Sequence, residues 1–408
     1  MAMEEKSVRL TFLGDIMLDW NMSLQLDRYV AQTESGYRFD DVFAPVEGLL
    51  KDSDYVMGNL ETPIAKDNKN LTNQQWEFCT PGAFAKAVHQ MGVHWVSTAN
   101  NHCLDRGIDG LVTTISELDK IGLAHSGTYA PKQKRKPLIV DVEGIKLGLL
   151  SYTYGTNAVS NGNYLPFKHR RLVDLVQEQE GRLAPWDPLT KFVKKHPKSK
   201  FQILRDCIEY KLLSTENGGR QWYEKETWDG YRLWLLKKDL KWLRKHGAEK
   251  IVIFLHIGGQ YNIEPNSYTK RVTKWLEDQG VDFVIANHEH VVHGSKIHAA
   301  GFTTYALGNF LGSAGTMKAP YDRRSEYSIA VHAYLDKATK ELMKVTYSVL
   351  RIVYTDEGKF QVWPVYDLLN GQTGGDYDAI RDGALQCACD FSGTLPCEIE
   401  GENLLWSK

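Results

Sequence analysis

The side chains that could do chemistry in this 408-residue chain follow short apolar segments. Each of five or six such segments, predicted to be a buried strand, ends in a carboxylate, an amide or an imidazole. These residues are Asp15, Asn59, Glu61, Asn100, Asn101, His102, His256, Asn287, His288, His290 and Asn309. A single Asp after a strand is more often a helix cap, but capping does not account for the whole set. Ligands of open α/β folds bind beyond the carboxyl ends of strands, so the set indicates a binding site.

The residue types in this set fit a site for two divalent metal ions. Two ions about 3.5–4 Å apart need a bridging carboxylate, several imidazoles, an amide oxygen and open positions for water. That inventory is supplied by Asp15, Glu61, Asn101, His256, His288 and His290. Because the ligands are oxygen and nitrogen without a thiolate, we expect Mn, Fe or Zn. His102 is then free to act as a general acid, and Asp105 is near enough in sequence to orient its ring.

The elements that must hold these residues alternate between strands and helices. The predicted strands cover residues 8–13, 55–57, 95–98, 251–255 and 283–286. Predicted helices at 81–91, 108–121 and 269–279 are each followed by glycine, a common helix stop signal. This alternation predicts an α/β sandwich with a largely parallel centre. Antiparallel strands are expected as a hairpin around Glu143-Gly144 and as three strands between residues 327 and 365.

The chain divides into one large domain and a C-terminal extension. We predict a domain over residues 7–354, with a helical or irregular insertion at about 155–230, and a C-terminal strand and peripheral tail over 355–408. The basic run at 191–200 is interpreted as a solvated loop, with binding of an anionic ligand as the alternative. Trp186, Trp222 and Trp228 are interpreted as packing residues, with a stacking platform for a polymer as the alternative.

The composition excludes several classes of protein. With 49 Lys+Arg and 51 Asp+Glu, the net charge of −2 argues against a nucleic-acid binder, unless a local basic face is hidden in the average. Residues 1–6 lack the apolar core of a signal peptide, and no apolar run could span a bilayer. We therefore expect a cytoplasmic protein, or an extracytoplasmic, membrane-anchored one if an N-terminal anchor has been removed. Cys387, Cys389 and Cys397 are expected to be reduced or locally paired thiols, with a structural metal site as the alternative.

Six motifs in a fixed order resemble a known family. They are GD (14–15), GNLETPI (58–64), ANNHCLDRG (99–107), HIGGQY (256–261), NHEHVVHG (287–294) and YALGNF (305–310). In this order, over about residues 7–335, they resemble the bacterial capsule synthesis family CapA/PgsA. The resemblance implies a place in the calcineurin-like metallophosphatase superfamily, the four-layer α/β sandwich of those enzymes, and a link to poly-γ-glutamate production.

The resemblance also implies a role for each site residue. The first ion would be bound by Asp15 and His290, the second by Asn101, His256 and His288, and Glu61 would bridge the two. His102 would contact the scissile group or protonate the leaving group. The predicted substrate contacts are Asn59, Asn100, Gln260, Tyr261 and Asn309.

Several positions depart from the family pattern. Met17 stands where the superfamily has a metal-binding His, as CapA-like sequences generally do, so the first ion would have fewer protein ligands. Gln260 replaces a glutamate, and Asp19-Trp20 and Asn287 also differ. We expect a metal-dependent hydrolase of capsule or poly-γ-glutamate metabolism, in which metal-bound hydroxide attacks a phosphoester or an amide. Its expected partners are an anionic polymer or phosphorylated substrate and other capsule-synthesis proteins, without nucleic acid. The alternative is a non-catalytic binding or assembly component with a vestigial site, which Met17 and Gln260 favour.

Overall fold

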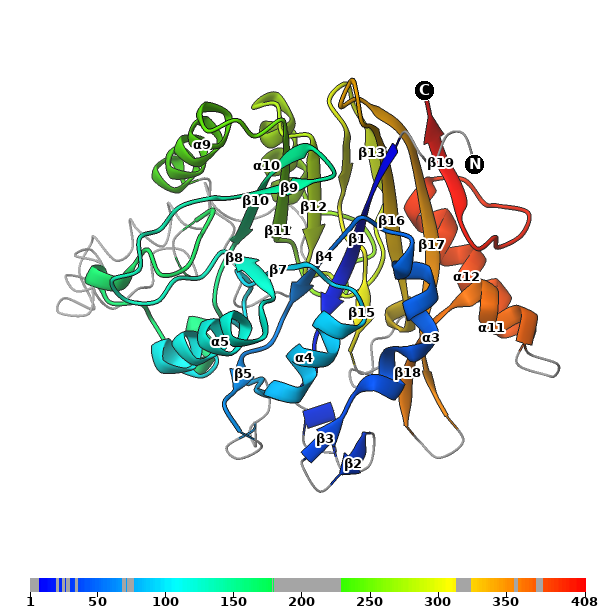
Figure 1. The fold of residues 1–408 in the computed structure, drawn as a ribbon, viewed down its shortest axis with the longest axis horizontal. Helices are drawn as coiled ribbons and strands as arrows, with labels where there is room; N and C mark the ends of the chain where they lie inside the picture. The colour runs from blue at the N-terminus through cyan, green and yellow to red at the C-terminus, as the bar shows by residue number, and fades with distance from the viewer. Residues whose placement is uncertain are drawn as a thin grey trace, which may run out of the picture.

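Two β-sheets with helices on their outer faces form the centre of the molecule (Figure 1). This computed structural model describes residues 7–19, 22–23, 26, 30–33, 36–67, 71, 77–177, 179, 229–312, 324–355, 359–371 and 377–408. Most of the predicted insertion, including its basic run and three tryptophans, lies outside the described residues, as does Trp20.

The first sheet joins a parallel half to an antiparallel half. Its strand order is β18-β17-β16-β1-β4-β7-β8, with β15 beside β1 and β19 beside β17. Strands β1, β4, β7, β8 and β15 are parallel, whereas β16 pairs antiparallel with β1, and β17 pairs antiparallel with β16, β18 and β19. The strands are β1 (Ser7–Ile16), β4 (Tyr55–Leu60), β7 (Trp95–Ser97), β8 (Ala124–Ser126), β15 (Asn309–Leu311), β16 (Tyr327–Asp336), β17 (Leu342–Tyr354), β18 (Phe360–Pro364) and β19 (Asn403–Ser407).

The second sheet has the order β13-β14-β12-β11-β10-β9. Its four inner strands are parallel, and β9 and β13 pair antiparallel at the edges. The strands are β9 (Leu138–Val142), β10 (Ile145–Thr153), β11 (Lys250–His256), β12 (Phe283–Asn287), β13 (Ser295–Ile297) and β14 (Phe302–Thr304). The predicted hairpin is confirmed: Glu143 and Gly144 join β9 to β10, both with positive φ, as a tight two-residue turn requires.

Helices cover both sheets. They are α3 (Asp40–Lys51), α4 (Gly82–Gln90), α5 (Gly107–Ile121), α9 (Gly230–Lys245), α10 (Ser267–Asp278), α11 (Val365–Gly371) and α12 (Tyr377–Ser392). Shorter elements are α6 (Ala158–Asn161), η2 (Phe167–His169), η3 (Arg324–Glu326), β2 (Ala31–Thr33), β3 (Gly36–Arg38), β5 (Ile64–Ala65) and β6 (Thr80–Pro81). The three predicted helix ends are confirmed, and Gly92, Gly122 and Gly280 have the positive φ of a helix stop. No helix in the described part of the chain has the length and apolarity needed to cross a bilayer.

Three apolar cores define the order of the layers. Side chains of β1, β4 and β7 meet those of β10, β11, β12 and β14 between the two sheets. On the outer face of the first sheet, α3 and α4 form a second core (Figure 1). On the outer face of the second sheet, α9 and α10 form a third. The order helix, sheet, sheet, helix confirms the four-layer α/β sandwich that we predicted.

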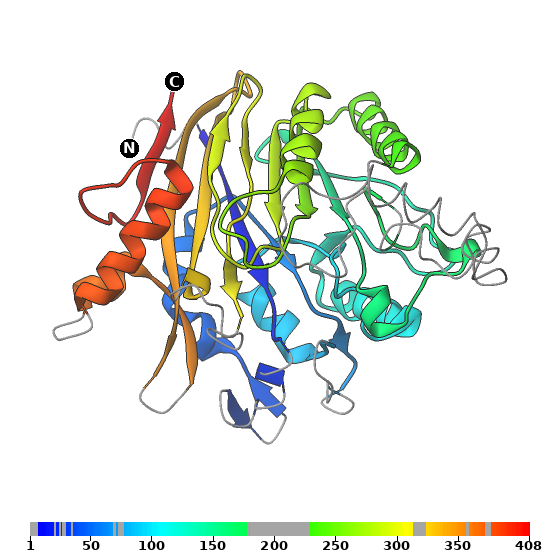
Figure 2. The ribbon, with the colours of Figure 1, turned by 180° about the vertical axis from the view of Figure 1, so that it is seen from behind.

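The C-terminal region, which we predicted to be peripheral, contributes a helix to the apolar core. Helix α12 buries an apolar stripe in the core between the sheets, made of Ile380, Ala384, Cys387, Ala388 and Phe391. Figure 2 shows α12 lying against β16 and β17, on the side of the molecule away from α9. The helical spacing of this stripe gave only a weak signal in the sequence, because alanine and cysteine are less hydrophobic than the larger residues that usually identify a buried helix face. Burial raises the pKa of the Cys387 thiol, which disfavours the thiolate that a metal site needs.

Phe12 lies at the centre of the core between the sheets and offers a test of the packing. Its ring centroid is 5.5 Å from that of Phe302 and 5.6 Å from that of Phe283. We expect Phe12→Ala to lower the free energy of unfolding by about 3–5 kcal/mol, measured in urea, because it leaves a cavity between two rigid sheets. Ile263→Ala, at a position that is 57% exposed, should change it by less than about 0.5 kcal/mol. Equal effects of the two substitutions would contradict this assignment of the core.

Candidate metal centre

The parallel strands bring the predicted polar residues to one edge of the sandwich. In the first sheet Asp15 of β1 lies opposite Asn59 of β4 on one side and Asn309 of β15 on the other. In the second sheet His256 of β11 lies opposite Asn287 of β12. The two edges meet, because Asn59 Nδ2 is 3.2 Å from His256 Nδ1. Each of the six predicted metal ligands is at most 4% exposed.

The candidate ligand atoms fall into two groups that share Glu61. One group contains Glu61, His256 and His288, and the other contains Asp15, Glu61 and His290. Within each group the ligand atoms lie within 4.8 Å of one another. His256 Nε2 is 3.3 Å and His290 Nε2 is 4.0 Å from the same oxygen, Glu61 Oε1. A carboxylate shared by two such groups is the arrangement that a dinuclear site requires.

Asn101 joins the group that contains His256. Its Oδ1 is 2.8 Å from His256 Nε2, the same nitrogen that faces Glu61. Its Nδ2 donates to Asn157 Oδ1 at 3.4 Å, which holds the amide with its oxygen toward the histidine. An amide oxygen, an imidazole nitrogen and a carboxylate oxygen therefore converge at this side of Glu61.

The carboxylates fit a divalent cation. Glu61 is fully buried, and neither of its oxygens accepts a hydrogen bond from the described residues. Burial and the negative charge of Asp15 raise the pKa of Glu61 well above its ordinary range. Burial also raises the pKa of Asp15 to about 6, although a hydrogen bond from Asn59 opposes the shift. Asp15 and Glu61 have carboxylate oxygens within 4.8 Å of each other. Two buried carboxyl groups at this separation are costly to ionise unless a cation compensates their charge.

Two of the imidazoles, those of His256 and His290, favour the neutral form that binds metals. Burial, and then the neighbouring His288, lower the pKa of His256 well below its ordinary range. Burial lowers the pKa of His290 to about 3. His290 Nδ1 is 2.9 Å from Asn309 Oδ1, so this nitrogen donates its proton to the amide oxygen. The lone pair of His290 Nε2 is then left facing Glu61.

His102 lies beside the two groups, with one ring nitrogen fixed and the other facing them. Nδ1 is 2.6 Å from Asp105 Oδ2, and Nε2 is 3.9 Å from Glu61 Oε1. Asp105 is held by the backbone N–H of Phe78 at 2.7 Å and by Asn161 Nδ2 at 3.2 Å. The Phe78 ring stacks on the imidazole at a centroid distance of 3.6 Å. This arrangement keeps the proton on Nδ1 and directs Nε2 toward the centre.

The residues predicted to contact substrate divide into two sets. Three asparagines form hydrogen bonds with protein groups of the site. Asn59 donates to Asp15, Asn100 donates to the carbonyl of Leu60, and Asn309 accepts from His290. They hold ligands and strand ends in place. Gln260 and Tyr261 instead lie half-buried in the turn after His256. The Tyr261 ring centroid is 5.4 Å from that of His290, which leaves the phenol beside the metal groups.

Sequence reasoning missed the role of Glu289, the residue between the two histidines of NHEH. Its Oε1 accepts a hydrogen bond from Gly259 N–H at 3.0 Å, and its carbonyl accepts one from Tyr261 N–H at 2.8 Å. A Cβ on Gly258, whose φ is +114°, would lie 2.2 Å from Glu289 Oε1. Glu289 therefore fixes the turn that carries Gln260 and Tyr261. The motif alone could not show this, because positive φ values at His288 and His290 break the alternation of side chains expected from a strand.

Met17 does not add a ligand to the group of Asp15. The residue is buried, and its Cε lies close to Gly312, where a Cβ would approach it to 2.6 Å. The Asp15 group thus has three carboxylate or histidine ligands, including the shared Glu61. That the first ion has fewer protein ligands stays a prediction.

The affinity for a divalent cation should fall in acid. Burial raises the pKa of Asp15 to about 6 and that of Glu61 well above its ordinary range, so in acid both carboxyl groups hold protons that a cation must displace. We expect the dissociation constant for Mn²⁺ to rise by about tenfold per pH unit for each displaced proton as the pH drops below 7. Calorimetry in two buffers of different ionisation enthalpy measures the protons released. The Asp15→Asn variant should release fewer protons than the wild type when it binds Mn²⁺. Binding that is independent of pH and releases no proton would contradict the ligand assignment.

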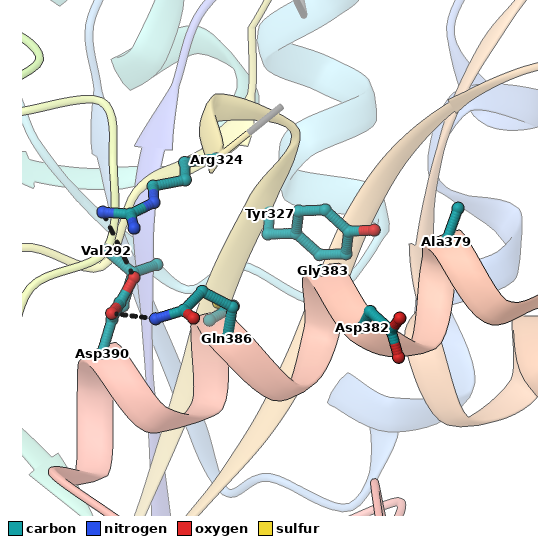
Figure 3. Close-up of a pocket in the computed structure, with 9 residues that line it drawn as sticks. Val292, Arg324, Tyr327, Ala379, Asp382, Gly383, Gln386 and Asp390 are labelled. Atoms are coloured by element: carbon teal, nitrogen blue, oxygen red, sulfur yellow. Dashed lines mark hydrogen bonds and ion pairs between the residues drawn. The ribbon is translucent and has the colours of Figure 1, made fainter. Parts of the chain in front are cut away.

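A cavity of about 310 Å³ lies apart from these residues, between α12 and the start of β16. Figure 3 shows Arg324 facing Asp390 beside it, and the two charges are 3.8 Å apart. None of the six predicted metal ligands lines this cavity. The candidate metal centre, a cluster of buried polar side chains, is therefore separate from this cavity.

The family model described as "Bacterial capsule synthesis protein PGA_cap" matches residues 9–314 of the chain, which include all six predicted metal ligands. The chain belongs to this capsule synthesis family. The family resemblance inferred from the motifs is thus confirmed.

Two curated members of the family illustrate the similarity. The chain is 25% identical over 318 residues to the capsule biosynthesis protein CapA of Bacillus anthracis. This alignment covers 76% of this chain and 61% of that protein. It is 23% identical over 308 residues to the PGA biosynthesis protein CapA of Bacillus subtilis strain 168, in an alignment that covers 75% of this chain and 63% of that protein. The chain thus spans about three-fifths of the length of these relatives. A solved structure of a phosphatase from Mycoplasma pneumoniae aligns with a TM-score of 0.40 and 12% identity, over 85% of this chain and 94% of that one.

Proposed function

We propose that this capsule synthesis family member is a metal-dependent hydrolase of capsule polymer metabolism, acting on a phosphoester or an amide bond. The observation that carries the proposal is the buried Glu61 carboxylate, which two groups of imidazole and carboxylate ligands share. The phosphoester is the favoured substrate class, because two cations held side by side stabilise both the attacking and the leaving oxygen of an in-line displacement.

In this proposal one set of residues holds the cations and another moves a proton. The cations would be held by Asp15, Glu61, Asn101, His256, His288 and His290. When bound, they would polarise the acceptor oxygen and lower the pKa of water.

His102, when protonated on both ring nitrogens, would give the proton on Nε2, the nitrogen that faces Glu61, to the leaving group and would keep the proton on Nδ1. Asp105 fixes the ring by accepting a hydrogen bond from Nδ1. The buried surroundings strengthen each of these electrostatic interactions.

The proposal is tested by removing and restoring the metal. The purified chain is stripped with a chelator, reloaded separately with Mn²⁺, Fe²⁺ or Zn²⁺, and assayed with phosphomonoesters, phosphodiesters and γ-glutamyl amides. Hydrolysis that is lost on stripping and restored by one of the ions supports the proposal. The substrate that is cleaved identifies the bond. A chain that binds metal but cleaves none of these substrates would overturn it.

The second candidate function is a binding or assembly component of a capsule polymer machine. It is favoured by Met17, because the Asp15 group gains no ligand from this position. In that case a capsule polymer would bind without being cleaved, and the single group around His256 would hold a structural ion. Anomalous scattering from crystals soaked in Mn²⁺ separates the candidates: two peaks beside Glu61 favour the hydrolase, and one favours the assembly component.

A further inference from the structure

Helix α9 presents an exposed face that carries only basic and aromatic side chains. The exposed positions recur every three or four residues and are Tyr231, Trp234, Lys237, Lys238, Lys241, Arg244 and Lys245. All of α9 is described, and its one acidic residue, Asp239, is buried and pairs with Arg135. The opposite face packs leucines on the second sheet. A basic face of this kind is unexpected in a chain whose net charge is only −2.

Aromatic rings on and beside α9 hold the cations in place. Lys238 Nζ is 3.7 Å from the centroid of the Trp234 ring, which is 48% exposed. The Arg170 guanidinium is 4.2 Å from the Phe167 ring and 5.3 Å from the Tyr231 ring. Cation–π contacts reduce the mobility of these long side chains, so less entropy is lost when they bind an anion.

The spacing of the charges fits a linear polyanion. The exposed cations form three successive levels along the helix, at Lys237 and Lys238, at Lys241, and at Arg244 and Lys245. Successive levels are three or four residues apart, which is about one turn or roughly 5.4 Å, and the 16-residue helix is about 24 Å long. A small anion would contact one or two of these charges, whereas a chain of repeated anionic groups contacts them all. The face is thus suited to a polymer.

The aromatic rings favour carboxylates over nucleic acid as the anionic groups. Binding of single-stranded nucleic acid relies on aromatic faces that are open for stacking with bases. Here the faces of Phe167, Tyr231 and Trp234 carry Arg170 or Lys238. The guanidinium of Arg170 offers the paired donors that match a carboxylate.

The same segment of chain connects this face to the candidate metal centre. Asn161 donates a hydrogen bond to Asp105, the partner of His102. The chain then continues to Phe167 and Arg170, which lie against Tyr231 at the start of α9. At its other end α9 leads into β11, the strand that ends at His256. A polymer bound on this face would thus lie on elements that also support the site.

We propose that the exposed face of α9, together with Arg170, binds a linear polycarboxylate. The choice of polymer rests on the proposed role in capsule polymer metabolism, whereas binding itself requires no catalysis. The face would retain the polymer while single bonds are presented to the metal centre.

The test measures fluorescence anisotropy of labelled poly-γ-glutamate of defined length with the full chain at low and high salt. We expect the triple variant Lys237→Glu, Lys238→Glu, Lys241→Glu to weaken binding by about tenfold or more at low salt. The matched control is Lys51→Glu, Lys86→Glu, Lys120→Glu, which makes the same charge change at exposed positions of α3, α4 and α5. Circular dichroism of both variants verifies folding. Trp234→Ala, which keeps every charge, should weaken binding about threefold because Lys238 loses its support.

Three results would overturn the proposal. One is wild-type binding that is absent at low salt, and another is an equal loss of affinity in the control variant, which would indicate a non-specific charge effect. The third is tighter binding of a single-stranded RNA with the same number of charges, which would identify a nucleic-acid surface instead. A wild-type chain that binds the polymer but hydrolyses nothing would contradict the hydrolase and leave this proposal supported, so the two failures are distinguishable.

Discussion

Glu61→Gln is expected to lose cation binding at both positions, because its carboxylate is the one ligand that the two groups share. We expect affinity for Mn²⁺ to fall by more than about 10²-fold and hydrolysis to fall to background. Asp15→Asn and His256→Ala should each weaken one position and leave the other. Metal content by mass spectrometry and Mn²⁺ titration measure the difference. The control is Glu326→Gln, which changes a glutamate that pairs with Arg351 outside the site.

The stability of the cation-free protein verifies that this variant is folded. In the absence of a cation Glu61 has a pKa raised well above its ordinary range, so folding becomes less favourable as the pH rises above 4.5, the ordinary value. Gln cannot ionise. The cation-free Glu61→Gln protein should therefore resist urea better than the cation-free wild type at pH 7, with the difference vanishing below about pH 4. A variant that is less stable at pH 7 and still retains both ions would contradict the role of a shared carboxylate.

His102→Ala should lose activity in proportion to how much the leaving group needs a proton. For an alkyl phosphoester, whose alkoxide is a poor leaving group, we expect kcat/KM to fall by about 10²–10⁴-fold. For a nitrophenyl phosphoester, whose leaving group departs without a proton, the loss should be much smaller. Metal content should be unchanged, because His102 Nε2 is 3.9 Å from Glu61 and belongs to neither ligand group.

Two further variants separate proton transfer from simple damage to the fold. His102→Gln keeps a polar side chain of similar length but removes the acid, and it should show the same dependence on leaving group as His102→Ala. Asp105→Asn should retain more activity, losing about 10–100-fold, because it weakens the hydrogen bonds that orient the ring but leaves the imidazole of His102 in place. Equal losses for both phosphoesters, or loss of bound metal, would exclude a general acid at position 102.

Much of the fold could be predicted because its signals are local. The strand at 251–255 is a continuous apolar run, and the helix at 108–121 has a regular apolar stripe and a glycine stop at Gly122, so both are found close to their predicted bounds. Helix α12 was missed as a core element because three of the five residues on its buried face, Ala384, Cys387 and Ala388, are small. Small side chains pack well on a sheet but give a weak hydrophobic signal.

The sequence by itself determined which residues could form the centre, because parallel strands place their carboxyl ends at one edge and polar residues follow each strand there. Only the tertiary structure decided how these residues are grouped. Glu61 is shared because the two sheets meet beside it, Met17 turns toward Gly312, and Glu289 reaches the backbone of Gly259. The basic face of α9 also needed the structure, because it alone shows that Asp239 is buried while the lysines are exposed. These features depend on distances between segments far apart in the chain, which no local pattern of residues encodes.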